Sequence, residues 1–278
     1  MGNTMELLKI DRDKCKKDGI CATECPMSII QMDHEEGYPR LIPDTEEVCL
    51  RCGHCIAVCP HGALQHASIP MERCPSIQKD LAINPEQAVQ FLRSRRSVRL
   101  YKDQPVEKEK IQELIEIARY APSAGNRQMI NWQVITDNDK IHQLAKLTVE
   151  WMRFILEKGP EAARAPYFPT IVTAWDKGMD RILRDAPALV VAHAPKEALN
   201  GMVDLTLALS YFELAAPTYG LGTCWAGLLQ GALLSRPEIK ELLGLPEKHP
   251  HHYPMMLVYA KPRYYRLPER KPPKIVWG

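Results

Sequence analysis

A run of four cysteines constrains this chain more than any other feature of its sequence. The run spans residues 49–60 and reads C-x2-C-x2-C-x3-C-P, ending at Pro60. Three thiolates from one tight loop can close on three corners of a cubane, while the fourth lies a helical turn further on and faces a second cluster. Structural zinc sites usually pair two C-x2-C units across a longer loop. The spacing therefore favours iron–sulfur clusters over zinc.

A degenerate copy of this run begins at Cys15, 34 residues before Cys49. The position of its missing cysteine holds Asp18, and Pro26 follows its last cysteine. Each copy predicts a ligand loop, a short helix and a strand. If each copy gives its last cysteine to the cluster of the other, two ligand sets result. The first set is Cys25, Cys49, Cys52 and Cys55, and the second is Cys15, Cys21 and Cys59 with Asp18 as a candidate fourth ligand.

Asp18 leaves the composition of the second cluster open. A carboxylate is a harder ligand than a thiolate and holds iron less firmly in a sulfur-rich site. This cluster is therefore either [4Fe-4S] with an aspartate ligand or [3Fe-4S]. Asp18-Gly19 also fits an ordinary turn, which would leave a three-iron or open site. Cys74 is a rival fourth ligand, although a buried thiol near the domain junction is the simpler interpretation.

Composition limits the classes of function. The chain has 278 residues, of which 45% are hydrophobic and 25% charged, as in globular proteins with a sizeable core. A net charge of +2 gives no reason to expect nucleic acid or a membrane surface as partner. Eight of the nine cysteines lie in the first 74 residues, and no signal peptide precedes them, so we expect a reducing cytoplasm. The apolar stretch 202–234 is interrupted by Asp204, Glu213 and Pro217, and predicts core rather than a membrane span.

The rest of the chain carries groups suited to a phosphate and a flat ring system. Asn84 and Pro85 predict a helix start. That helix leads into a basic run whose guanidiniums can bind phosphate oxygens in bidentate fashion. A helix predicted over 106–121 is followed by the polar loop 122–128, whose amides can read the edge of a flavin ring. A strand is predicted at 132–136. The basic run consists of Arg95, Arg96, Ser97 and Arg99.

These motifs support two resemblances. Residues 8–66 resemble a two-cluster bacterial ferredoxin, and residues 88–274 resemble the FMN-dependent nitroreductase family. The second resemblance adds the segment Gly220–Gly227, expected at the flavin N5 edge, and a basic pair near the C-terminus, expected on the phosphate. It implies FMN, a homodimer with FMN at the subunit interface, and a set of contact residues. These are Arg95, Arg96, Ser97, Arg99, Ser123, Asn126, Gln128, Trp225, Ala226, Gly227, Arg270 and Lys271.

The resemblance has one departure. Some members of the nitroreductase family carry a glutamate beside the glycine of the N5 segment, where this chain has Ala226. This weakens any transfer of their NAD(P)H handling to this chain. No G-x-G-x-x-G follows a predicted strand, so no Rossmann site supports a nicotinamide.

We therefore expect an α+β protein of two domains. Residues 1–66 form a ferredoxin-like domain with a two-cluster βαβ repeat, 67–84 a proline-rich linker, and 85–278 a nitroreductase-like FMN-binding α+β sandwich. Within the second domain we predict a helix over 139–158. The resemblance implies that the proline-flanked aromatic stretch after it covers the flavin, and packing between helices is the alternative for these aromatic residues. A buried strand at 187–194, an apolar helix at 202–219 in the core or a dimer interface, and a last strand at 255–259 follow.

Two further groups of residues receive structural interpretations. The three histidines between residues 249 and 252 suit no single helical face, which argues against a metal site. Cys224 is expected to be a packed thiol near the flavin rather than a nucleophile, because no activating base is identifiable.

The expected function is that of an iron–sulfur flavoprotein oxidoreductase. A reduced carrier of ferredoxin or flavodoxin type supplies the clusters, which reduce FMN, and FMN reduces a small conjugated acceptor such as a nitroaromatic or a quinone. No side chain is assigned as general acid. Two alternatives stay open: an electron relay to a protein partner without small-molecule turnover, and an oxygen-sensing switch built on the labile cluster at Asp18.

Overall fold

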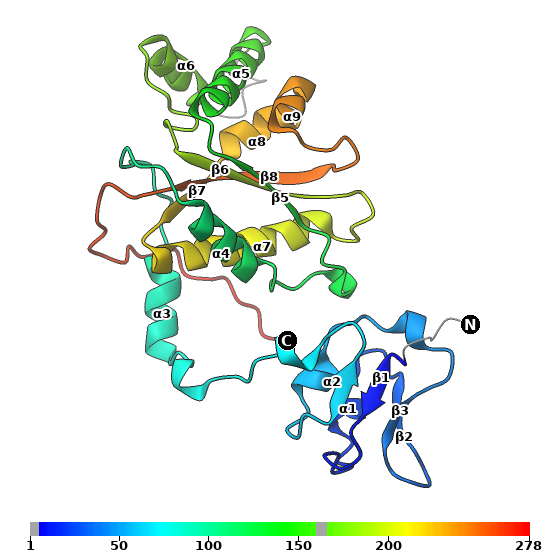
Figure 1. Cartoon of the computed structure of the whole chain (residues 1–278). Coiled ribbons are helices and arrows are strands. Elements are labelled where there is room, and N and C mark those ends of the chain that lie inside the picture. The colour runs from blue at the N-terminus through cyan, green and yellow to red at the C-terminus, as the bar shows by residue number, and fades with distance from the viewer. Residues whose placement is uncertain (1–5, 160–165) are drawn as a thin grey trace. The chain divides into compact units, whose positions relative to one another are not determined.

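The computed structural model describes residues 6–159 and 166–278, which divide into two compact units (Figure 1). The first unit runs to Ala82 and includes Gly125–Arg127, and the second holds Ile83–Ala124 and Gln128–Gly278. The first unit thus extends past the expected boundary at residue 66, because Ile69 pairs with the preceding strand and packs on the core of that unit. No helix among the described residues is long and apolar enough to cross a membrane.

In the first unit, each copy of the cysteine run forms a short helix followed by a strand. The strands pair antiparallel in two small sheets, β1 with β4 and β2 with β3. The elements are β1 (Leu8–Ile10), α1 (Ile20–Thr23), β2 (Ile30–Met32), β3 (Pro39–Leu41), α2 (His54–Ala57) and β4 (Leu64–His66), with 3-10 turns η1 (Glu46–Val48), η2 (Met71–Arg73) and η3 (Lys79–Leu81).

The two copies share one backbone geometry. Gly19 and Gly53 immediately precede α1 and α2, and both adopt a left-handed conformation, with φ of 73° and 76°. Glycine takes this conformation without the steric cost that a Cβ imposes. The two glycines are 34 residues apart, the same offset as the cysteine runs (53 minus 19, and 49 minus 15). The repeat in the sequence is therefore a repeat in the structure.

The second unit is built on a four-stranded antiparallel sheet of order β5-β6-β8-β7. The predicted helices and strands are present, with ends shifted by a few residues. The strands are β5 (Asn131–Ile135), β6 (Ala188–Ala194), β7 (Gly222–Trp225) and β8 (His251–Val258). The helices are α3 (Pro85–Ser94), α4 (Lys108–Ala118), α5 (Asn138–Glu157), α6 (Phe168–Asp176), α7 (Gly201–Ala215), α8 (Gly227–Leu233) and α9 (Pro237–Leu243), with 3-10 turns η4 (Ala124–Asn126) and η5 (Ala216–Tyr219).

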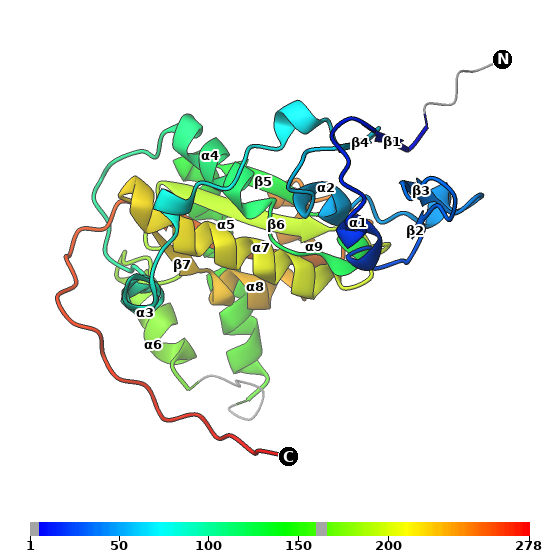
Figure 2. The same ribbon diagram turned by 90° about the horizontal axis from the view of Figure 1, so that it is seen from below.

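Helices cover both faces of this sheet (Figures 1 and 2). The helices α4 and α7 lie on one face, and α5, α8 and α9 on the other. Every residue of β6 is buried, because successive side chains of a strand point to opposite faces and both faces are covered. Leu189 and Val191 pack with α5 and α8, while Ala188 and Val190 pack with α4 and α7. The expected α+β sandwich is confirmed.

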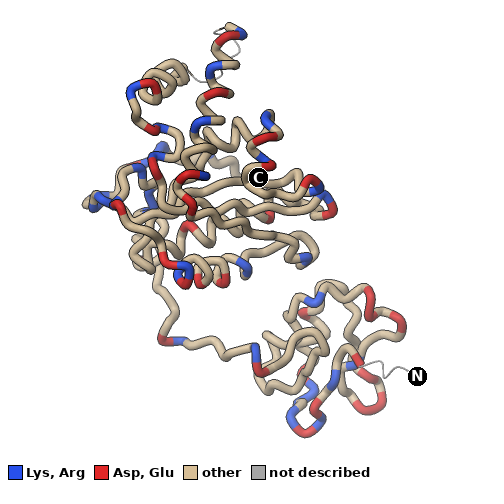
Figure 3. Tube along the Cα trace, turned by 45° about the horizontal axis from the view of Figure 1, so that its top comes forward, with Lys and Arg blue, Asp and Glu red and all other residues tan. Residues whose placement is uncertain are grey.

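Local signals explain several element ends. The predicted cap of α3 is present, since the Asn84 side chain accepts a hydrogen bond from the Gln87 amide at 2.9 Å and Gln87 returns one at 2.9 Å. The α-helical hydrogen-bond pattern of α7 stops at Ala215, two residues before Pro217, which lacks an amide proton. Basic and acidic residues are interspersed along the chain in both units (Figure 3).

Candidate cofactor sites

The four thiols of the first expected ligand set line one cavity of the first unit. Cys25, Cys49, Cys52 and Cys55 surround it together with His66. Burial, and then the neighbouring Cys52, raise the pKa of Cys55 to about 11. Four cysteines around one cavity match the number of thiolates that hold a [4Fe-4S] cluster. The donor set therefore fits an iron–sulfur cluster.

A second cavity of the same unit is lined by Cys15, Cys21 and Cys59 together with Asp18. Cys59 belongs to the later run but lies with the thiols of the earlier one, and Cys25 lies the other way round. This agrees with the expected exchange of the last cysteine between the two copies. Among the described residues, no three such side chains converge on the position of a single metal ion.

Asp18 forms a turn and lines this cavity at the same time. Its Oδ1 accepts a hydrogen bond from the Ile20 amide at 3.2 Å, and its Oδ2 lies 3.7 Å from Nε2 of His61. Cys74, the rival ligand, is not among the residues that line either cavity. Its thiol donates to the Pro70 carbonyl at 3.5 Å. Of the two candidates for a fourth ligand, Asp18 lines the second cavity and Cys74 does not.

His66 is a residue of the first cavity that the spacing analysis did not single out. It ends β4, and its side chain is buried, with 4% exposed. Its Nδ1 accepts a hydrogen bond from the Ser68 amide at 3.0 Å, and its Nε2 lies 3.7 Å from Sγ of Cys49. Burial, and then the charge of Arg51, lower the pKa of His66. No signal in the sequence distinguishes this histidine from the other eight.

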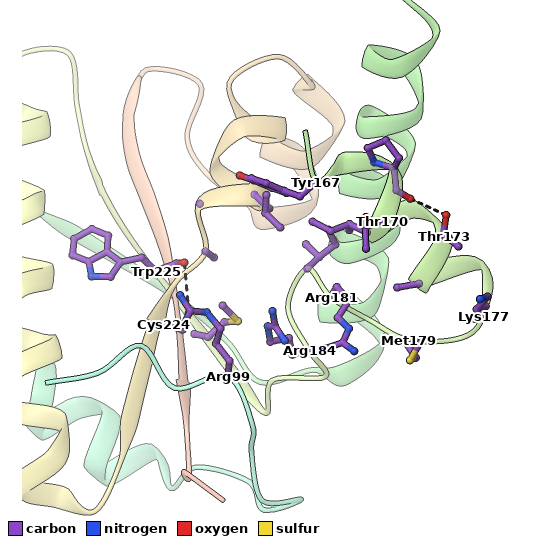
Figure 4. A pocket seen from close by; sticks show the side chains of 18 residues that line it. Arg99, Tyr167, Thr170, Thr173, Lys177, Met179, Arg181, Arg184, Cys224 and Trp225 are labelled. Atoms are coloured by element: carbon purple, nitrogen blue, oxygen red, sulfur yellow. Dashed lines mark hydrogen bonds between the residues drawn. The ribbon is translucent and has the colours of Figure 1, made fainter. Parts of the chain in front are cut away.

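The second unit contains a cavity of about 980 Å³ where β7 leads into α8 (Figure 4). Four basic side chains line it, and none of the described residues that line it is an aspartate or a glutamate. Both the volume and the charge suit a large ligand that carries a phosphate. The residues that line the cavity include Arg99, Tyr167, Lys177, Arg181, Arg184, Cys224, Trp225, Ala226 and Gly227.

Close packing holds the basic run against β7. The Val98 amide donates to the Thr223 carbonyl at 2.8 Å, and Ser97 forms a parallel bridge to Thr223. A Cβ on Gly222 would lie 2.4 Å from Cγ2 of Val98, so the absence of a side chain at 222 permits this approach. The contact places Arg99 at the cavity.

Arg95 has a different partner from the expected phosphate. Its Nη1 donates to Oε1 of Glu213 at 3.0 Å. Glu213 is 6% exposed and also accepts from the Trp225 indole at 2.9 Å and from the Thr223 hydroxyl at 3.3 Å. A buried carboxylate needs such partners. The Arg95 guanidinium thus offsets the buried charge of Glu213, and its expected contact with the phosphate stays a prediction.

The same network explains the orientation of Trp225. Figure 4 shows its indole on the side of β7 away from the cavity, so the residue contributes mainly backbone to the lining. Cys224, next to it, is buried, and burial raises the pKa of its thiol. A thiol with a raised pKa is a poor nucleophile. This agrees with the interpretation of Cys224 as a packed thiol.

Two arginines of the cavity were absent from the sequence-based set. A tight turn presents them: Oδ1 of Asp180 accepts hydrogen bonds from the amides of Ile182 at 2.6 Å and Leu183 at 3.1 Å. Both apolar side chains are buried in the core, and the flanking Arg181 and Arg184 line the cavity. The sequence offered one sign of these two arginines: they flank the apolar pair Ile182 and Leu183 shortly before a buried strand.

The other expected flavin contacts are not among the described residues that line this cavity. Arg96 Nη1 donates to the Arg95 carbonyl at 2.8 Å. Ser123 Oγ accepts from the Gln128 amide at 3.0 Å, and both residues line a smaller cavity beside α7. Arg270 and Lys271 are exposed in a C-terminal segment without regular structure.

Asn126 belongs to the short segment grouped with the first unit. Its Nδ2 donates to the carbonyls of Leu50 at 3.1 Å and Arg51 at 2.9 Å, in the loop that carries Cys49 and Cys52. The side-chain NH2 group of Asn126 therefore donates both of its hydrogen bonds to backbone carbonyls.

The histidines near β8 do not converge on one point. Nδ1 of His249 lies 2.7 Å from Nδ1 of His193, and Nδ1 of His252 lies 3.3 Å from Oε1 of Gln230. Burial, and then the neighbouring His249, lower the pKa of His193 to about 4. These rings are packed partners in the core at the end of the sheet.

Comparisons with known proteins match both units. The profile of the nitroreductase family matches residues 92–260, and that of the 4Fe-4S dicluster domain matches residues 13–64. The chain is 28% identical over 158 residues to a CR(VI) reductase of Pseudomonas sp. (strain G-1), which is 57% of this chain and 60% of that protein. It is 38% identical over 65 residues to Ferredoxin 7Fe of Hydrogenibacillus schlegelii, which is 23% of this chain and 77% of that protein.

The fold also matches a solved structure, a nitroreductase with bound FMN from Bacteroides fragilis NCTC 9343. The TM-score is 0.56 at 20% identity, over 70% of this chain and 98% of that chain. Likeness at this identity concerns the fold. The chain spans about three fifths of the length of the Pseudomonas reductase. Because the family profile covers more than half of the sequence, this chain belongs to the nitroreductase family and carries a 4Fe-4S dicluster domain ahead of the nitroreductase domain.

Proposed function

We propose that this chain is an FMN-dependent oxidoreductase that receives its electrons through two iron–sulfur clusters. One observation carries the proposal: a single chain contains two thiol-lined cavities and a basic cavity bounded by the backbone of Ala226 and Gly227. When bound, FMN supplies the transfer of electrons or hydride to an acceptor. Membership of the nitroreductase family supports this assignment, as does the FMN bound in the Bacteroides fragilis neighbour.

The proposed cluster ligands are the side chains that line the two thiol cavities. The first cluster is held by Cys25, Cys49, Cys52 and Cys55, and the second by Cys15, Cys21 and Cys59 with Asp18 beside them. The name of the Hydrogenibacillus schlegelii relative gives it seven irons, which supports three irons in one of its two clusters. We propose the cavity with Asp18 as the one that holds either three irons or a labile fourth.

The proposed phosphate contacts are basic and polar side chains around the large cavity. Arg99 remains in the set, and Arg181 and Arg184 join it because all three line the cavity. The backbone at Ala226 and Gly227 would lie against the ring. Arg95, which also pairs with Glu213, stays in the proposed set. Arg96, Ser97, Arg270 and Lys271 stay as proposals.

A homodimer with FMN at the subunit interface is part of the proposal. Ser123 and Gln128 line a different cavity of their own chain from Arg99, so they would serve the flavin of a second copy. Exposed apolar residues on α7 support such an interface, since Met202 is 40%, Val203 56% and Tyr211 41% exposed.

The acceptor is proposed to be a small conjugated molecule such as a nitroaromatic or a quinone. Tyr167, at one wall of the cavity, offers a ring on which a flat acceptor can stack (Figure 4). Chromate is a further acceptor to test, because the basic lining suits an oxyanion and the name of the Pseudomonas relative refers to Cr(VI). The electron donor would be a reduced carrier of ferredoxin or flavodoxin type.

Anaerobic preparation with quantified iron, sulfide and flavin tests the proposal. Stoichiometric reduction with dithionite should leave no oxidised flavin beside reduced clusters, and addition of a nitroaromatic, quinone or chromate should reoxidise the flavin repeatedly. Cys52→Ser should abolish flavin reduction by the protein carrier, whereas the matched control Cys74→Ser should not, because Cys74 lines neither thiol cavity. Protein that binds no flavin, or flavin that stays oxidised beside reduced clusters, would refute the proposal. Reoxidation by a protein partner alone would favour the relay.

A further inference from the structure

The buried ring of His66 has a tautomer that its two hydrogen bonds determine. The Ser68 amide can only donate, and it points at Nδ1 of the ring from 3.0 Å. Nδ1 must therefore be the unprotonated nitrogen of a neutral imidazole. The proton then lies on Nε2, which makes Nε2 the donor in its 3.7 Å contact with Sγ of Cys49. The direction of this hydrogen bond thus follows from the network around the ring.

Cys49 is consequently the acceptor of two hydrogen bonds. Besides the imidazole, the Arg51 amide donates to its Sγ at 3.4 Å. Strand pairing fixes the imidazole in place, since His66 pairs with Leu8 of β1 and bridges to Ile69. A 4%-exposed side chain held on both sides has little freedom to turn away from the sulfur.

The second thiol cavity has no equivalent of this contact among the described hydrogen bonds. Its histidine, His61, lies 3.7 Å from the carboxylate of Asp18 rather than from a sulfur. Among the described hydrogen bonds, the sulfur of Cys59 accepts one from a backbone group, the Ala63 amide at 3.4 Å. The two cluster sites therefore differ in their hydrogen bonding as well as in their ligands.

We propose that His66 raises the reduction potential of the cluster held by Cys25, Cys49, Cys52 and Cys55 by donating its Nε2 proton in a hydrogen bond to the Cys49 sulfur. Reduction adds one electron to the cluster and increases the negative charge on its sulfur ligands. A donor at one of these sulfurs stabilises the reduced form more than the oxidised form. His66 thus acts through Cys49, as partners of metal ligands do in other metal sites. The inference rests on the proposed ligand set.

Replacement of the donor tests this effect in the whole chain with clusters and FMN in place. His66→Phe keeps a flat ring and removes the donor, and His66→Gln keeps an N–H that can reach the sulfur. His61→Phe is the matched control, because it changes the histidine of the other cavity. Redox titrations followed by electron paramagnetic resonance would measure the potential of each cluster separately.

We expect His66→Phe to change the ratio of reduced to oxidised cluster at a fixed solution potential by about tenfold, which is ~59 mV toward lower potential for one electron. His66→Gln should recover part of that shift, and His61→Phe should leave this cluster unchanged. Equal potentials in the wild-type and His66→Phe proteins, with full iron content in both, would overturn the inference. Loss of both clusters from wild-type protein would instead refute the proposed function.

A spectroscopic measurement on the wild-type protein does not depend on any variant. In protein whose histidines alone carry ¹⁵N, the reduced cluster should show weak hyperfine coupling to one imidazole nitrogen through the N–H···S bond. His61→Phe should retain the coupling and His66→Gln should lose it. The absence of coupling in the wild-type protein, or its persistence in His66→Gln, would overturn the assignment.

Discussion

Replacing Gly222 with alanine tests how the basic run is attached to β7. The backbone of Gly222 is ordinary strand, so alanine meets no φ penalty there, and its Cβ would lie 2.4 Å from Cγ2 and 3.1 Å from Cβ of Val98. Carbon atoms pack best at about 3.5–4.0 Å, so the nearer contact is more than ~1 Å too short. Because Val98 is 4% exposed and held by the 2.8 Å bond to Thr223, it cannot move away freely.

We expect Gly222→Ala to lower the free energy of unfolding by ~1–3 kcal/mol, the usual cost of overpacking. It should also weaken FMN binding by about tenfold, equivalent to ~1.4 kcal/mol, because Arg99 follows directly on the displaced Val98. Urea unfolding of the FMN-free protein and fluorescence titration with FMN would measure the two effects.

A compensating substitution provides the control. Val98→Ala removes the clashing methyl groups and alone should cost ~1–2 kcal/mol through lost burial. If the contact is the cause, Gly222→Ala combined with Val98→Ala should be less destabilised than the sum of the single variants, and should regain most of the FMN affinity. Additive losses of stability in the double variant, or a Gly222→Ala protein that behaves as wild type, would refute the reasoning.

Three further outcomes are expected. Asp18→Cys should increase the iron content to eight per chain and abolish the signal of an oxidised three-iron cluster, because a thiolate holds the fourth iron more firmly; unchanged iron and spectra would contradict the ligand assignment. Glu213→Ala should cost ~3–5 kcal/mol in urea unfolding, since it leaves Arg95 and the Trp225 indole without their acceptor, and Glu213→Gln should cost less. The pKa of His193 is lowered to about 4 in the folded chain, so the unfolded chain binds more protons between pH 6.5 and 4. Stability from this residue should be complete above pH ~6.5 and decline by up to ~3 kcal/mol as the pH falls to 4; an equal decline in His193→Gln would exclude it as the cause.

Short-range chemistry made much of this protein predictable. The cysteine spacing and the 34-residue offset of the two copies were sufficient to assign the thiols that line each cavity, because ligand loops obey local geometry. Apolar periodicity located the helices and the buried strands of the sandwich within a few residues. A helix that buries one face has apolar residues with a period of about 3.6, and a strand that buries one face has them with a period of about 2. The cap of α3 at Asn84 was readable for the same reason.

Partners that are far apart in the sequence were decided only by the tertiary structure. Arg95 and Glu213 are 118 residues apart, and nothing near either one in the sequence predicts that the two side chains pair. His66 reaches Cys49, 17 residues earlier, only because β4 pairs with β1 and turns the ring toward the sulfur. Arg181 and Arg184 line the cavity because the core buries the two apolar residues between them. The spacing of residues in the sequence shows which side chains belong to the same loop. Only the packing of the folded chain determines which side chains from different loops come into contact.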